Sequence, residues 1–135
     1  MILTDNSYQV ITFDESKSML TESWKPGTID MNEDAYKKEL TIYADWVEKY
    51  QPKRILVNIQ NLMFAITPGI QIWTINNIVI RVVEAGPDKQ AFIVPRGFPI
   101  KLAHEEKDPF DDDMDLGINI RYYDNPEEAT KWILL

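Results

Sequence analysis

The stretch from Arg54 to Gly86 constrains the fold of this chain more than any other segment. It opens with the run Ile55-Leu56-Val57, and apolar runs rich in β-branched residues are typical of strands covered on both faces. A short loop follows, and then a long apolar segment leads to Gly86. The stretch therefore predicts a buried strand, a loop and a helix around which the rest of the chain packs.

Both ends of the predicted helix carry recognisable signals. Thr67 stands where an N-cap side chain accepts a hydrogen bond from a free backbone N–H, and Pro68 suits the first helical position because that position needs no N–H donor. At the other end, Gly86 can adopt the left-handed cap and Pro87 cannot continue a helix. These signals predict a helix over residues 68–85.

The faces of this helix are uneven. At about 100° per residue, one narrow wedge is polar and consists of Thr74, Asn77, Arg81 and Glu84. The opposite side is apolar and is expected to face the sheet; it consists of Ile72, Ile75, Ile78, Val79, Val82 and Val83. Trp73 and Ile80 widen the apolar arc beyond what one sheet face needs. Either another helix lies alongside, or the arc is a dimer or ligand surface flanked by Trp73 and Ile80.

The remaining elements alternate between strands and helices. We expect strands over residues 7–13 and 17–24, joined as an antiparallel hairpin by the turn at 14–16, and over 89–94 and 118–123, in addition to the one at 54–60. Amphipathic patterns predict helices over 32–50 and 126–134, and residues 99–106 fit a short helix. We therefore expect a single α/β domain over residues 1–135, with a mixed sheet of about five strands flanked by about four helices.

The expected core lies on the central strands and on the sheet-facing side of the long helix. It consists of Leu56, Val57, Ile59, Ile75, Val79, Val82, Phe92 and Val94.

The composition of the chain excludes several kinds of site and argues against several kinds of partner. The 135 residues contain no cysteine, which excludes disulfides, thiolate metal sites and cysteine nucleophiles. The net charge of −8 argues against nucleic-acid binding and against electrostatic binding to anionic membranes. No signal peptide and no run of spanning length is recognisable in the sequence. We therefore expect a cytoplasmic protein that is not inserted in a membrane.

Motifs for catalysis or metal binding are weak. His104 is the single histidine, and its neighbours Glu105 and Glu106 do not share a helix face with it. An acidic run is similar to a calcium loop, but the glycine and the bidentate glutamate that such a loop requires fall on Leu116 and Tyr122. The run consists of Asp108, Asp111, Asp112, Asp113 and Asp115. We expect no metal site, no cofactor and no catalytic residue.

The order and spacing of the elements resemble a known family. The features are the early Trp24 and Gly27, the strand RILVNI, the loop leading to TPGIQIW, the strand KQAFIVP and the closing segment RYYDNPEEATKWI. Over almost the whole chain they resemble the STAS domain, and more closely the small stand-alone proteins called SpoIIAA-like, or STAS/SEC14-type. The resemblance implies an α/β fold and a regulatory or carrier role.

The resemblance also implies a candidate phosphorylation site. STAS antagonists carry a phosphorylatable serine at the N-terminus of the helix that follows the central strand, and Thr67 falls on that position, with Gly69 on the family's glycine. Ile66 stands where the family has aspartate, and Pro68 follows Thr67. Thr67 is therefore either a regulatory phosphosite or only a helix cap.

Three classes of function follow from these observations. The first is a non-catalytic regulatory protein-interaction module that uses the helix at 68–85, self-associating as a homodimer with Trp73 or Ile80 at or beside the contact. The second is a carrier of a small apolar or lipid-like ligand, which the SEC14 likeness implies. The third is an enzyme with an unrecognised site. The wide apolar arc of the helix supports the first two classes, and the poverty of catalytic motifs counts against the third.

Overall fold

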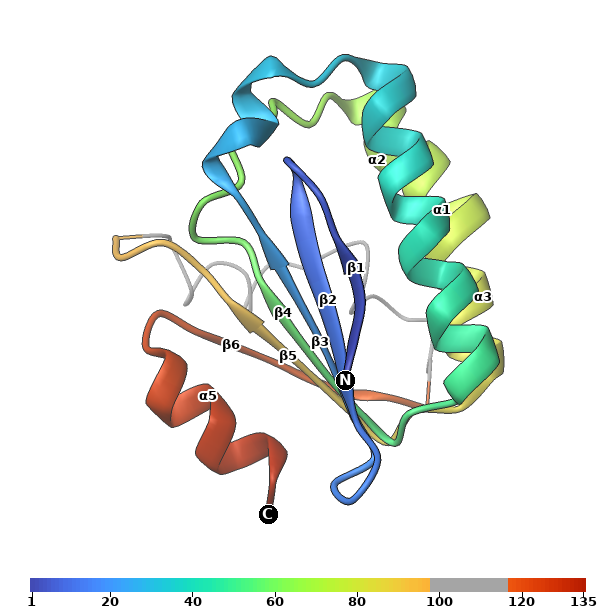
Figure 1. Ribbon diagram of the computed structural model, residues 1–135, viewed down its shortest axis with the longest axis vertical. Coiled ribbons are helices and arrows are strands. Elements are labelled where there is room, and N and C mark those ends of the chain that lie inside the picture. Colours follow the sequence, from blue (N-terminus) through green and yellow to red (C-terminus); the bar gives the residue numbers. More distant parts are fainter. Residues whose placement is uncertain (98–116) are drawn as a thin grey trace.

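One six-stranded mixed sheet forms the centre of the computed structural model, which describes residues 1–97 and 117–135 (Figure 1). β1, β2 and β3 are antiparallel, whereas β3, β4, β5 and β6 run parallel to one another. The α/β class and the mixed sheet are therefore confirmed. The strands lie side by side in chain order as β1 (Ile2–Asp5), β2 (Gln9–Asp14), β3 (Met19–Trp24), β4 (Arg54–Asn58), β5 (Lys89–Ile93) and β6 (Asn119–Tyr123).

Helices cover the two faces of the sheet unequally. On one face lie α1 (Glu33–Tyr50), which the 3-10 helix η1 (Pro26–Asp30) precedes, and beside it a continuous helix (Figure 1). This second helix consists of α2 (Pro68–Thr74), the π-helical turn η2 (Ile75–Val79) and α3 (Ile80–Ala85). On the other face, α5 (Pro126–Ile133) packs against β4, β5 and β6.

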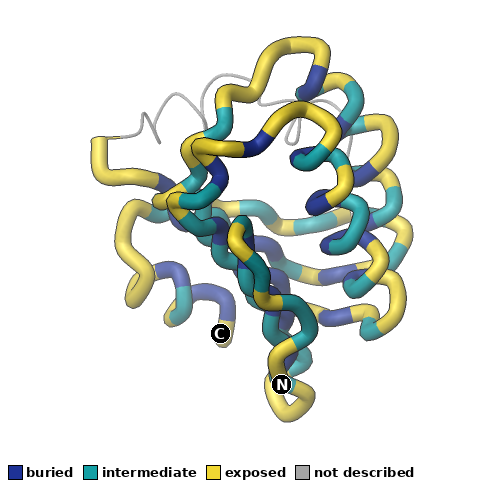
Figure 2. The backbone as a smooth tube through the Cα atoms, turned by 45° about the horizontal axis from the view of Figure 1, so that its top comes forward, coloured by how far each residue is buried: buried dark blue, intermediate teal, exposed yellow. Residues whose placement is uncertain are grey.

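Two apolar clusters hold these layers together, and the dark segments in Figure 2 trace them along the chain. The larger cluster lies between the sheet and α1 with α2, η2 and α3. It contains several stacked aromatic pairs, among them Phe13 with Tyr50 and Trp24 with Tyr36. The smaller cluster lies under α5 and consists of Leu56, Ala91, Ile93, Ala129, Trp132 and Ile133.

The strand count predicted from the sequence was wrong, because β1 was not expected. β1 is short, lies at the edge of the sheet and exposes Ile2 and Asp5, so it lacks the alternation that marks a half-buried strand. The other five predicted strands are present with shifted bounds. The short helix fitted to residues 99–106 lies outside the described residues, as do His104 and the acidic run.

Helix α1 agrees closely with its predicted pattern. Asn32 is the N-cap, with its side-chain oxygen 2.8 Å from the amide nitrogen of Ala35. The amphipathic pattern predicts an apolar stripe of Tyr36, Leu40, Tyr43, Val47 and Tyr50; the first four are buried and Tyr50 is half-buried.

The connection from β3 to α1 is fixed by a close backbone approach. A Cβ atom on Gly27 would lie 2.3 Å from the carbonyl oxygen of Ser7, so no larger residue fits there without movement. Next to it, the buried Thr28 hydroxyl donates to the carbonyl of Lys25 and accepts from the amide of Met63, each at 2.8 Å. These contacts join the loops that follow β3 and β4.

Candidate functional site

The long helix begins and ends where the sequence predicts. The Thr67 hydroxyl oxygen lies 3.3 Å from the amide nitrogen of Ile70 and caps it, and Gly86 ends the helix with φ at 82°. The predicted cap role of Thr67 is confirmed. The Thr67 residue is itself exposed to solvent.

A π-helical turn in the middle of this helix decides which face is buried. The amide of Ile80 donates to the carbonyl of Ile75, five residues earlier. In a pure α-helix, residues four positions apart are rotated by about 40° relative to each other around the helix axis. The wider turn offsets most of that rotation. One row therefore stays buried over three turns, and it consists of Ile70, Thr74, Ile78 and Val82.

The predicted burial of this helix needs correction. Ile75 and Val79 are half-buried, and Ile72 is 60% exposed, because the expected face assumed a uniform 100° per residue. Thr74 was placed on the polar wedge but is buried, since its hydroxyl donates to the carbonyl of Ile70 and leaves no free donor. Val82 is buried as predicted.

The burial predicted for the central strands agrees better with the structure than the burial predicted for the long helix. Leu56, Val57 and Val94 are buried as expected, whereas Ile59 and Phe92 are half-buried.

The side of the helix that faces α1 carries Trp73 and Arg81. The ammonium nitrogen of Lys37 lies 5.2 Å from the centre of the Trp73 ring, and Trp73 packs half-buried against the larger cluster. The Arg81 guanidinium forms ion pairs with Asp45 and Glu48 of α1. The predicted alternative of a helix lying alongside therefore accounts for Trp73.

The outer face of the same helix is open and mainly apolar, with the exposed Asn76 between Ile72 and Ile80. Ile80 is 47% exposed and lies two turns from Ile72, on the same row because of the π-helical turn. The row beside it holds three half-buried apolar residues. We call the five residues the outer apolar face: Ile72, Ile75, Val79, Ile80 and Val83. Of the two residues predicted to flank an interaction surface, Ile80 belongs to this face and Trp73 does not.

A second unusual site is polar and lies inside the larger cluster. Glu22 on β3 is 2% exposed, Gln9 on β2 is fully buried and Glu39 on α1 is 4% exposed. The Gln9 amide nitrogen donates to the backbone carbonyl of Glu39 at 3.0 Å and to its carboxylate at 3.5 Å, and Asn6 donates to the same carboxylate oxygen. These contacts connect α1 with the hairpin formed by β1 and β2, which we call the first hairpin.

Burial dominates the electrostatics of this site. The pKa of Glu22 is raised from 4.5 to about 8, chiefly by desolvation; a hydrogen bond with the Trp24 side chain acts in the opposite direction, and the charge of Glu39 adds to the increase. Burial also raises the pKa of Tyr36 and of Tyr43, and the charge of Glu22 adds to both shifts. Burial of Glu22 therefore favours its protonated form in the folded protein.

Sequence reasoning missed Glu22 and Glu39, although a signal was present. Glu22 alternates with Leu20 and Trp24, so period 2 places it on the buried face of β3. Glu39 lies three residues after Tyr36, on the apolar stripe of α1. The available signal was a charged residue at a position where the periodicity of the element predicts burial.

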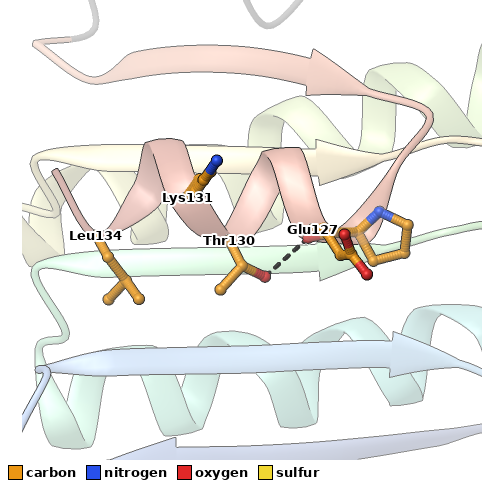
Figure 3. A pocket seen from close by; sticks show the side chains of 5 residues that line it. Glu127, Thr130, Lys131 and Leu134 are labelled. Carbon is orange, nitrogen blue, oxygen red and sulfur yellow. Dashed lines mark hydrogen bonds between the residues drawn. The ribbon is translucent and has the colours of Figure 1, made fainter.

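An open depression borders α5 on the opposite face of the sheet (Figure 3). It is lined by Pro126, Glu127, Thr130, Lys131 and Leu134. The Thr130 hydroxyl donates to the carbonyl of Pro126 at 2.8 Å, so its donor is used within the helix. The depression presents mainly apolar surface.

Within residues 1–97 and 117–135, no group of three or more His, Asp or Glu side chains is arranged to hold a metal ion, and no helix is long and apolar enough to cross a membrane. A scan against protein-family models found no match, and searches of curated proteins and of solved structures also found none.

Proposed function

We propose that this chain is a non-catalytic protein-interaction module of the STAS, SpoIIAA-like type, and that it self-associates through the outer apolar face. The observation that carries the proposal is the exposure of Ile72 and Ile80, at 60% and 47%, on one row of the long helix, where the exposed Asn76 lies between them. Clusters of exposed apolar residues on a protein surface usually meet a partner. The resemblance of the chain to STAS domains supports a regulatory role.

The lack of charge on the outer apolar face permits a second copy as the partner. The chain carries a net charge of −8, so two copies repel each other over most of their surface. The five residues of the outer apolar face are uncharged, the exposed Glu84 lies one turn beyond Ile80, and Arg81 is engaged with α1. A two-fold axis would place this uncharged face against itself, and two-fold dimers are the commonest oligomers.

Sedimentation at micromolar concentration tests the proposal. Wild type should sediment as a dimer and Ile80→Lys as a monomer, because a lysine in the contact would bury an unpaired charge. Ile29→Lys is the matched control, since Ile29 is 67% exposed on η1 and lies outside the face. A wild-type monomer, or equal loss of the dimer in both variants, would contradict the proposal.

A further inference from the structure

Two buried oxygens in the polar site have no partner among the described residues. They are Oε1 of Gln9 and Oε2 of Glu22. A buried polar atom without a hydrogen bond is strongly unfavourable, so each such atom in a folded core requires an explanation. An amide oxygen only accepts, and a carboxyl oxygen donates when it carries a proton.

The strand register makes these two side chains neighbours. Gln9 pairs with Trp24 and Ile11 pairs with Glu22 across the β2–β3 ladder, and both Gln9 and Glu22 point toward α1. Residues diagonal to each other on one face of an antiparallel pair lie within reach of long side chains. One proton on Glu22 would therefore satisfy both oxygens with a single hydrogen bond.

The ionisable groups around Glu22 offer no compensation for a negative charge. From α1 they are Glu39, Tyr36 and Tyr43, all acidic. The Trp24 side chain forms a hydrogen bond with Glu22, β2 contributes the neutral Gln9, and β4 contributes the apolar Val57. No Lys or Arg side chain is buried in the part of the chain that the structure describes.

We propose that Glu22 keeps its proton in the folded protein and donates it to Gln9 Oε1, which makes the chain Glu22–Gln9–Glu39 a pH-sensitive joint between α1 and the first hairpin. Gln9 then accepts from Glu22 and donates to Glu39, while Asn6 donates to Glu39 from the β1–β2 turn. When Glu22 loses its proton, the joint loses its first hydrogen bond and places a second carboxylate near Glu39. The hairpin and the N-terminal half of α1 then separate more easily.

Infrared difference spectroscopy in D₂O tests where the proton is. Folded wild type at pH 6.5 should show the carbonyl stretch of a protonated carboxylic acid, and Glu22→Gln should lack it. Glu15→Gln, which changes an exposed glutamate in the β2–β3 turn, is the matched control and should retain the band. If wild type shows no such band, the proposal is overturned. If Glu22→Gln fails to fold, loss of the wild-type band on titration to pH 10 with the fold intact supports the proposal, and persistence of the band overturns it.

Hydrogen exchange tests the joint itself. After correction for the intrinsic effect of pH, opening at the amides of Tyr36, Leu40 and Tyr43 should increase roughly tenfold per unit between pH 5 and 7.5, since an opened Glu22 ionises at its ordinary pKa. Glu22→Gln should abolish this dependence, and Glu15→Gln should keep it. The same pH dependence in Glu22→Gln as in wild type would overturn the proposal.

Discussion

Two neighbouring helices on one face of the sheet depart from ordinary amphipathic packing in opposite directions. α1 brings the carboxylate of Glu39 into the interior, beside Glu22. The helix formed by α2, η2 and α3 instead leaves Ile72 and Ile80 in solvent. The comparison shows that a polar group inside needs partners from the same chain, which Gln9 and Asn6 supply, whereas an apolar group outside needs a partner from another chain.

The largest expected effect is the difference in stability between substitutions on the buried side and on the exposed side of the long helix. Ile78→Asp should destabilise the fold by roughly 4 kcal/mol, because Ile78 is 3% exposed and the new carboxylate would be buried without a partner. Ile80→Asp should change the free energy of unfolding by less than about 0.5 kcal/mol. Urea denaturation at low protein concentration measures both, and Val79→Asp, at a half-buried position, should fall between them. Equal effects at Ile78 and Ile80 would show that the buried row is misassigned.

The next effect concerns pH and the interior of α1. The pKa of Glu22 is about 8 in the folded protein against an ordinary value of 4.5. Below pH 4.5 both states hold the proton and the stabilisation is complete. Between 4.5 and 8 only the folded state holds it, so the free energy of unfolding should fall by about 1.4 kcal/mol per pH unit from this group. Above pH 8 the folded state loses the proton too, and the decline levels off.

Denaturation curves at several pH values measure this slope. Glu22→Gln should remove the Glu22 contribution and make the protein more stable than wild type at pH 8, but not at pH 4.5. A variant with the slope of wild type would show that another group causes the pH dependence.

The smallest expected effect concerns the N-cap at the start of the long helix. Thr67→Ala should cost about 1 kcal/mol of stability, because the amide of Ile70 loses its cap, and Thr67→Ser should be nearly neutral. Thermal or urea unfolding measures the difference. If Thr67 is also a regulatory phosphosite, Thr67→Glu should alter self-association more than it alters stability, and a variant that associates like wild type would count against that role.

Residues with strong local signals could be read from the sequence. Thr67 and Gly86 fix the ends of the long helix, and the stripe from Tyr36 to Val47 fixes the buried face of α1. These features depend on backbone preferences and on periodicity, which act over a few residues.

The features that the sequence did not reveal depend on tertiary context. The π-helical turn at Ile75–Val79 has no sequence pattern, and it shifted burial from Ile75 and Val79 to Ile78. The site at Glu22 was missed because a glutamate in a strand is usually exposed, and only the packing of α1 over β3 makes it a buried acid.

Because β1 to β6 lie in the sheet in chain order, no strand has to enter between two strands that are already paired. The sheet can grow from the β1 edge while the chain leaves the ribosome, at about 5–20 residues per second. β3 can then pair with β4 only after η1, α1 and β4 have been synthesised. During that interval β3 exposes a row of unpaired backbone groups, through which two nascent chains can pair with each other.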